Sequence, residues 1–358
     1  MSKVKVAVLY GGKSVEHEVS VHSAEKVCEL LSDKFEVLNI FIDKTGHWFL
    51  QDACGPATSS DRPVYPTLSK DGVLFDHRNR KIDIDVFFPV LHGTKGEDGA
   101  LQGFFEVAEI PFTGCGVIAS AMGMNKEISK IIAQKYGVPI LPYVLVARGF
   151  EITKEFEENV STMLGLPVFV KPVNLGSSIG VTKVKEIKDL KAAVEYAAQF
   201  DTEILVEKGV DSPREIFCAI KESPAGVQAS LCGELIPNGS EFFDYDSKYI
   251  DPNGCITKVP ASIDKELEEE MRAASLAVFK GLKCAGLARV DFLLDAEGNY
   301  YFSEINTLPG MSDTSLFPQL WRASGSDYKT ILEELVETAL KHAQLKKILE
   351  RISNENLV

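Results

Sequence analysis

The chain has 358 residues, of which 45% are hydrophobic and 25% charged, a composition typical of a globular protein with two or three domains. Its formal net charge of −14 disfavours nucleic acid and anionic membranes as partners, because both select basic surfaces, and a small molecule is expected instead. No apolar run reaches the roughly 18–20 residues that span a membrane, and seven scattered cysteines without a Cys-x-x-Cys pair predict reduced thiols and a cytoplasmic location.

Strands and helices alternate in the first third of the chain. Apolar runs predict strands over residues 3–10, 35–42 and 84–91, and a helix through 23–31. This alternation predicts a parallel sheet with helices on its faces. The first residues are expected to form the first strand and no signal peptide. Residues 51–80 are polar and contain several prolines, so they are predicted to leave this domain as an excursion.

Two further regions are predicted downstream. The second begins with a helix at 126–137 and continues with strands at 139–146, 166–172 and 203–209 and a helix near 188–199. The third contains strands at 214–220 and 229–236, a long helix, a hairpin and a C-terminal helix. The long helix is indicated by Leu267, Met271, Ala274, Val278 and Leu282, which recur at helical spacing.

The hairpin at 288–306 carries the strongest chemical pattern. If Glu297-Gly298 is the centre of its turn, paired positions sum to 595, which sets Asp291 opposite Glu304 and Arg289 opposite Asn306 on one face. Two facing carboxylates repel each other, and a hard divalent cation with oxygen ligands offsets that repulsion. Arg289 could then hold an anionic oxygen beside the metal. The alternative is a solvated face on which Arg289 bridges the acids.

Three loops are candidate parts of a functional site. Lys171 ends an apolar strand and precedes the glycine–serine loop 176–180, whose amides and hydroxyls suit phosphate, although no Walker pattern occurs in the chain. The segment 11–20 follows the first strand and opens a helix, where Glu16 is able to bind an ammonium group. The loop 92–99 follows another apolar strand, and loops at the carboxyl ends of strands carry function in such sheets. A plain turn, an N-cap and a solvent-exposed loop are the respective alternatives.

Together these motifs resemble the D-alanine–D-alanine ligases of the ATP-grasp superfamily, in the same order and over nearly the whole chain. The motifs are GGKSVEHEVS, HGTKGEDGALQG, TGCGVIASAMGMNK, VKPVNLGSSIGV, VEKG, FDYDSKY and ARVDFLLD followed by SEINTLPGMSDTSLFP. The resemblance implies an α/β fold with α+β lobes: a parallel α/β substrate domain over 1–118, a central ATP-grasp lobe over 119–208 and a C-terminal lobe over 209–358. The two lobes would sandwich ATP, and residues 240–254 would form a lid.

The implied reaction is the ATP-dependent ligation of two D-alanines, through a D-alanyl phosphate, for peptidoglycan precursors. Two Mg²⁺ ions per site are implied, with Mn²⁺ expected to substitute, in a cytoplasmic homodimer that binds neither nucleic acid nor membrane. Ligation of D-alanine to D-lactate or D-serine, and other ATP-grasp carboxylate–amine ligations, are the alternatives. The lid pattern around Tyr249 is typical of enzymes that make the dipeptide.

The resemblance also implies roles for individual residues. The metal ligands would be Asp291, Glu304 and Asn306. The catalytic set would be Glu16, Ser177, Tyr249, Arg289, Gly310 and Ser315. ATP would be bound by Lys126, Lys171, Ser178, Glu207, Lys208, Val210, Glu215 and Lys248. The two D-alanines would contact Glu16, His92, Arg289, Gly310, Ser315 and Leu316. The chain departs from the family pattern at Cys115, Asn125 and Ala288, and its segment 208–215 is one residue longer.

Overall fold

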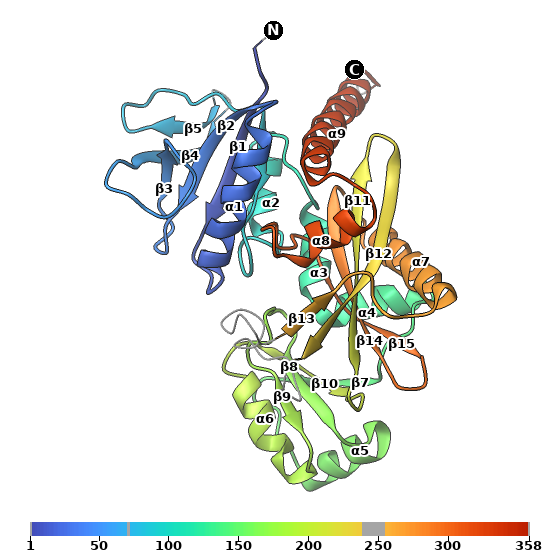
Figure 1. Ribbon diagram of the computed structural model, residues 1–358. Helices are drawn as coiled ribbons and strands as arrows, with labels where there is room; N and C mark the ends of the chain where they lie inside the picture. The colour runs from blue at the N-terminus through green and yellow to red at the C-terminus, as the bar shows by residue number, and fades with distance from the viewer. Residues whose placement is uncertain (1, 70–71, 238–254, 357–358) are drawn as a thin grey trace.

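Three β-sheets organise the part of the chain that the structure describes, residues 2–69, 72–237 and 255–356 (Figure 1). In this computed structural model the first sheet comes from the N-terminal third, the second from the middle and the third from the C-terminal part. Figure 1 shows the second sheet below the third, with the first sheet to one side.

The first sheet has six strands in the order β5-β4-β3-β2-β1-β6. They are β1 (Lys5–Gly11), β2 (Glu36–Ile42), β3 (Trp48–Gln51), β4 (Arg62–Ser69), β5 (Gly72–Asp76) and β6 (Val86–Pro89). The predicted strands at 3–10, 35–42 and 84–91 are confirmed, and β1 pairs in parallel with both β2 and β6.

Residues 51–80 correct the sequence-based prediction, because they extend this sheet instead of leaving it. β3, β4 and β5 pair antiparallel, so the sheet is parallel only over β2, β1 and β6. Pro63 and Pro66 lie within β4 and interrupt the strand pattern in the sequence, since proline cannot donate to a ladder.

The second sheet is antiparallel, in the order β7-β10-β8-β9. Its strands are β7 (Tyr143–Ala147), β8 (Val168–Pro172), β9 (Thr182–Val184) and β10 (Glu203–Lys208). Helices α5 (Lys154–Leu164) and α6 (Leu190–Ala197), the latter preceded by a short 3₁₀ turn, η1 (Ile187–Asp189), complete this lobe. The buried core cluster of the lobe contains only residues between 146 and 206, so the lobe is packed as a unit of its own.

The third sheet is antiparallel, in the order β13-β12-β11-β14-β15. Its strands are β11 (Arg214–Ser223), β12 (Gly226–Pro237), β13 (Cys255–Lys258), β14 (Leu287–Leu294) and β15 (Tyr300–Asn306). The long predicted helix is α7 (Lys265–Gly281), which packs on β11, β12 and β14. Helices α3 (Val117–Met124) and α4 (Lys126–Lys135) contact β15, so their packing joins them to the third sheet although they precede the second in the chain.

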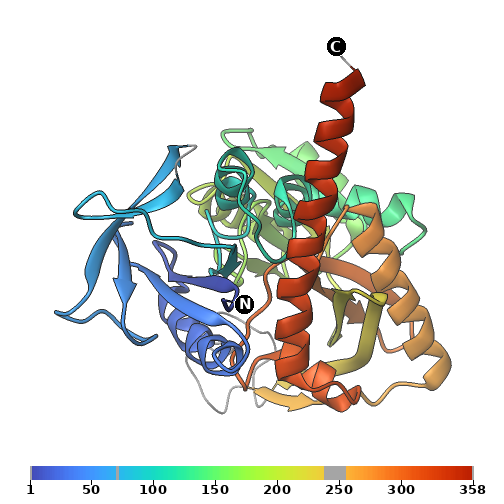
Figure 2. The same ribbon diagram turned by 90° about the horizontal axis from the view of Figure 1, so that it is seen from above.

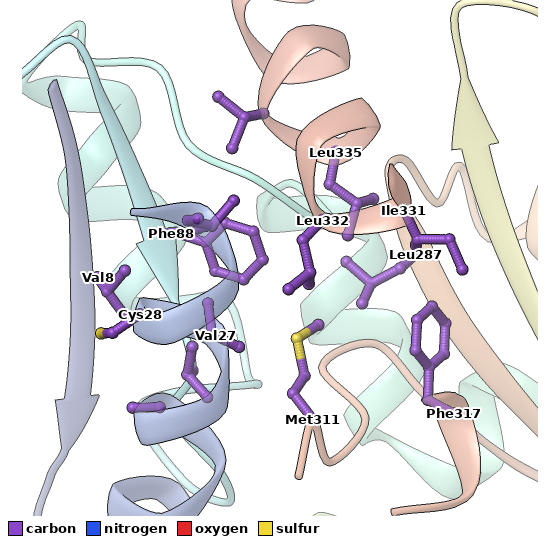
Figure 3. Packing of buried hydrophobic residues seen from close by; sticks show 14 of the residues in the cluster. Val8, Val27, Cys28, Phe88, Leu287, Met311, Phe317, Ile331, Leu332 and Leu335 are labelled. Carbon is purple, nitrogen blue, oxygen red and sulfur yellow. The ribbon is translucent and has the colours of Figure 1, made fainter. Parts of the chain in front are cut away.

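One hydrophobic cluster joins the first sheet to the third. Val8 of β1, Val27 of α1 (His17–Leu31) and Phe88 of β6 belong to the same cluster as Leu287 of β14 and Leu332 of α9 (Tyr328–Asn356), as Figure 3 shows. Helices α2 (Ala100–Val107) and α8 (Leu316–Ala323) flank the junction. Helix α9 continues beyond it, and Figure 2 shows its C-terminal end projecting from the body. Across the described residues, we find no helix both long and apolar enough to cross a membrane.

Candidate active site

A cavity of about 1310 Å³ is lined by residues of the first sheet's loops and of both other sheets. It gathers most of the predicted site: Glu16, His92, Lys126, Lys171, Ser177, Ser178, Glu207, Lys208, Val210, Glu215, Arg289, Asp291, Glu304, Asn306, Gly310, Ser315 and Leu316. Lys248 and Tyr249, with the predicted lid 240–254, lie outside the described residues. Residues up to 300 positions apart therefore converge on one space.

The β14–β15 hairpin has the predicted pairing at the site. Asp291 pairs with Glu304 and Arg289 with Asn306, and all four line the cavity. The pairing nearer the turn differs, because Leu294 pairs with Tyr300 and those positions sum to 594. A bulge at Ser303 restores the register between the turn and the site.

The two facing carboxylates each have a cationic neighbour. Arg289 donates two hydrogen bonds to Asp291, Nε to Oδ1 and a terminal nitrogen to Oδ2, both at 2.7 Å. Lys126 Nζ lies 3.6 Å from Glu304 Oε2. The Arg289 guanidinium also stacks 5.2 Å from the Phe217 ring centre. Arg289 thus pairs with Asp291, and Glu304 is met by a lysine from α4.

The donor set of the hairpin fits Mg²⁺. Two carboxylates and the Asn306 amide oxygen are hard oxygen ligands, and Mg²⁺ keeps its remaining positions for water and phosphate. Asn306 Oδ1 accepts a hydrogen bond from the Leu308 amide at 2.9 Å, which orients the oxygen and leaves a second lone pair. Within the described ranges, no group of three His, Cys, Asp or Glu side chains forms an alternative metal centre.

Lysines surround the acid Glu207 at the junction of the second and third sheets. Lys171 Nζ of β8 lies 2.6 Å from Glu207 Oε2, and Lys130 Nζ of α4 lies 2.5 Å from Oε1. Burial lowers the pKa of Lys126, whose ammonium donates to the Leu175 carbonyl at the start of the glycine–serine loop. Burial alone would raise the pKa of Glu207, but Lys130 and Lys171 bring it below its ordinary value.

Lys130 is a residue that the sequence reasoning missed. It lies one helical turn after Lys126 on the face of α4 that also buries Ser129 and Ala133. A lysine on an otherwise buried helix face was the available signal.

The glycine–serine loop meets the N-terminal segment across the cavity. Ser177 Oγ donates a hydrogen bond of 2.6 Å to Glu16 Oε1, which brings together two residues predicted to meet the first D-alanine. Ser177 and Ser178 have φ values of 53° and 56°, in the left-handed region that few non-glycine residues adopt. A Cβ atom at Gly93 would lie 2.8 Å from Glu16 Oε2, so glycine is needed there to admit the carboxylate.

A second serine–glycine contact lies at the start of α8. Ser315 precedes that helix, and its hydroxyl accepts a hydrogen bond from the Ser312 amide at 3.1 Å. A Cβ atom at Gly310 would lie 2.8 Å from Ser315 Oγ, so the Gly310 backbone approaches this hydroxyl closely. Gly310 and Ser315, both predicted to contact the substrate, are therefore neighbours at one wall of the cavity.

His92 and Glu97 form a buried pair beside Glu16. His92 Nδ1 lies 3.4 Å from Glu97 Oε1, and His92 Nε2 has no hydrogen-bond partner among the described residues. Burial raises the pKa of Glu97 to about 7. Burial alone would lower the pKa of His92, but Glu97 and Glu16 raise it above its ordinary value. The sequence named the loop 92–99 and the histidine but gave Glu97 no role; an acid five residues after His92 was the signal.

This pair predicts a pH-dependent difference in stability. Relative to Glu97→Gln, the wild type is expected to lose up to about 3 kcal/mol of unfolding free energy as pH rises from 4.5 to about 7. The folded state keeps a proton at the Glu97 carboxyl over that range, because burial disfavours its charged form, whereas the unfolded state releases that proton. Urea unfolding at pH 5–8 measures this. The exposed Glu36→Gln is the control, and parallel curves for wild type and Glu97→Gln would contradict the prediction.

Comparisons with known proteins agree with this geometry. Residues 5–115 match the family model described as the D-ala D-ala ligase N-terminus, and residues 132–337 match the D-ala D-ala ligase C-terminus. The chain is 40% identical to D-alanine–D-alanine ligase A of Escherichia coli, over 96% of this chain and 98% of that protein. Among solved structures, the D-alanine-D-alanine ligase from Coxiella burnetii superposes with a TM-score of 0.86 at 30% identity, covering 98% of this chain and 99% of that one. The VanG D-Ala:D-Ser ligase from Enterococcus faecalis gives 0.84 at 33% identity, covering 94% and 100%.

Proposed function

The chain belongs to the D-alanine–D-alanine ligase family and has the ATP-grasp fold, and on that premise we propose that it joins two D-alanines to D-alanyl-D-alanine at the expense of ATP. The observation that carries the proposal is the convergence of the anion-binding loop, the acid pair and Arg289 on one cavity between the sheets. The product would serve as a peptidoglycan precursor. The cytoplasmic location and the homodimer remain predictions from the family resemblance. The same holds for the domain limits at residues 118 and 208.

The first half of the reaction needs the D-alanine carboxylate beside the γ-phosphate of ATP. Glu16, fixed by Ser177, would hold the ammonium of this D-alanine and leave its carboxylate free to attack phosphorus. Lys126 and Lys171 would hold the phosphates, Glu207, Lys208 and Val210 would border the adenine, and Glu215 would take the ribose. The products are ADP and D-alanyl phosphate.

Asp291, Glu304 and Asn306 would hold Mg²⁺ at the phosphates. The ions, when bound, would neutralise charge that develops during phosphoryl transfer. In the chain itself, Lys126 links Glu304 to the glycine–serine loop, so the metal-binding hairpin and the phosphate-binding loop are held together.

In the second half, the amine of the second D-alanine attacks the carbonyl carbon of D-alanyl phosphate. The carbonyl oxygen becomes an oxyanion, which Arg289 and the Gly310 amide would stabilise, and inorganic phosphate then leaves. Ser315 and Leu316 would receive the second D-alanine. His92, which lines the cavity beside Glu97 and Glu16, would lie near this reaction centre.

The decisive experiment measures ADP and phosphate release with ATP and Mg²⁺ in the presence of D-alanine or L-alanine, followed by mass spectrometry of the product. We expect ADP and phosphate to be released with D-alanine but not with L-alanine, and the product to be D-alanyl-D-alanine. An absence of D-alanine-dependent release would overturn the proposal.

A D-alanine–D-serine product is the second candidate, because the VanG D-Ala:D-Ser ligase shares the fold at 33% identity. Competition of D-alanine with D-serine and D-lactate as second substrates decides between them. We expect the dipeptide of two alanines to dominate, since relatives at 37–41% identity are named D-alanine–D-alanine ligases.

The Ser177–Glu16 contact predicts a defect in substrate binding. Ser177→Ala is expected to raise the KM for D-alanine at the first site roughly 10-fold to 100-fold, the range for losing a hydrogen bond to a charged group. Steady-state kinetics at saturating ATP measure it. Thr58→Val removes another hydroxyl–carboxylate contact, to Asp61 at 2.6 Å, outside the cavity, and should leave the KM unchanged. A wild-type KM in Ser177→Ala would refute the assigned role of this serine.

A further inference from the structure

Lys130 is a fully buried charge to which the mechanism above gives no task. Its side chain is 0% exposed, its Nζ donates to the Phe302 carbonyl at 3.2 Å and lies 5.9 Å from the Phe302 ring centre. It ends 2.5 Å from Glu207 Oε1. The short distance makes this contact an ion pair. Its geometry does not make it a directed hydrogen bond, and Glu207 Oε1 has no other hydrogen-bond donor among the described residues.

The two lysines at Glu207 differ in their surroundings. Lys171 lines the cavity, within reach of a ligand, and meets Glu207 Oε2 at 2.6 Å. Lys130 lies behind Glu207 in the packing between α4 and β15 and is tied to the backbone of β15. A phosphate in the cavity competes for Lys171 and cannot reach Lys130.

Stability alone does not account for this lysine. Removing an ammonium group from water is costly, and replacing a buried ion pair by apolar side chains of similar volume is often neutral or stabilising. Replacing Lys130 alone by an apolar residue would instead remove one of the two cations that compensate the buried Glu207 carboxylate. The charge is therefore expected to serve the group it contacts, which is Glu207.

We propose that Lys130 is a positioning residue for base recognition: it holds the Glu207 carboxylate ionised and directed into the cavity while Lys171 engages phosphate. Glu207 then accepts a hydrogen bond from the exocyclic amine of adenine and rejects a base with a carbonyl at that position. The inference rests on the proposed use of ATP and adds a residue that does not itself touch the nucleotide.

The test compares the binding of ATP and inosine triphosphate, which carries a carbonyl in place of the amine. Calorimetry with the Mg²⁺ complexes gives the ratio of the two Kd values. In the wild type this ratio should favour ATP. In Lys130→Met, the affinity for ATP should fall roughly 10-fold to 100-fold and the ratio should move toward one, because the Glu207 acceptor is no longer held ionised and in place to pair with the amine. Lys130→Arg should restore selection.

The controls separate positioning from folding. Lys135→Met, an exposed position on the same helix, should change neither Kd. A double-mutant cycle with Glu207→Gln should show that Lys130→Met has little further effect on the ratio once the carboxylate is gone. If Lys130→Met does not fold, Lys130→Gln takes its place, since it removes the charge and keeps a donor for the Phe302 carbonyl.

The outcomes are distinguishable from those of the proposed function. A Lys130→Met protein that binds both nucleotides as the wild type does would overturn the inference, as would a wild type that does not select ATP. Both results leave D-alanine ligation untouched. Conversely, a wild type that selects ATP through Lys130 but makes no dipeptide would refute the proposed ligation alone.

Discussion

Glu304→Gln is expected to lower kcat for dipeptide formation by about a thousandfold, about 4 kcal/mol of activation free energy. Glu304 faces Asp291 across the β14–β15 ladder and lies 3.6 Å from Lys126. A glutamine keeps the size of the side chain but removes the charge that would bind the metal and pair with the lysine. Initial rates over a Mg²⁺ titration, with Mn²⁺ binding followed by electron paramagnetic resonance, measure the loss.

The matched control is Glu297→Gln in the turn of the same hairpin, where the side chain is exposed and away from the cavity. It should leave rate and metal affinity unchanged. If Glu304→Gln retained Mg²⁺-dependent turnover near the wild-type rate, the hairpin face would be a structural ion-pair surface and the proposed metal site would be wrong.

The cavity lies between two separately packed units. The first and third sheets share one hydrophobic cluster, and α9 carries the ion pairs Lys34–Glu333 and Lys329–Asp33 across the junction. The second sheet has a separate core. The phosphate-binding loop therefore belongs to a unit whose core is separate from the one that carries the hairpin.

The hairpin shows how far the sequence alone could predict the site. Period-two alternation and a two-residue turn placed Asp291 opposite Glu304, and that pairing is confirmed. The predicted turn register itself was wrong by one residue, because five residues separate Leu294 from Tyr300. The bulge at Ser303 compensates for that difference. The β-propensity of a serine does not predict a bulge.

Long-range packing explains the other differences. The ATP-grasp fold was expected from the family resemblance of the ordered motifs, and it is confirmed. The extension of the first sheet by β4 and β5 did not, because their prolines and polar residues hide a pattern that depends on pairing with β3. Lys130 was missed for a related reason, since its role depends on Glu207, 77 positions later in the chain, and on Phe302 of the third sheet.

Arg289→Met is expected to lower kcat/KM for the second D-alanine by about 100-fold to 1000-fold, the cost of removing one oxyanion donor. Its guanidinium makes two hydrogen bonds to Asp291 and stacks on Phe217, so it is held in one place at the cavity wall. Arg289→Lys should not rescue the rate, because an ammonium cannot reproduce a planar, two-pronged contact. Initial rates of dipeptide formation over a range of D-alanine concentrations, at saturating ATP, measure the effect.

A second measurement tests the step at which Arg289 acts. If the guanidinium stabilises the oxyanion of acyl transfer, D-alanyl phosphate still forms in Arg289→Met but reacts more slowly with the amine, and more of it is lost to water. The yield of dipeptide per ADP should then fall below one. Arg80→Met removes another arginine paired with an aspartate, Asp76, in an exposed part of the first sheet, and should leave both rate and yield unchanged. A variant with a slow rate but full yield would place Arg289 in phosphoryl transfer instead, because that defect would precede the acyl phosphate.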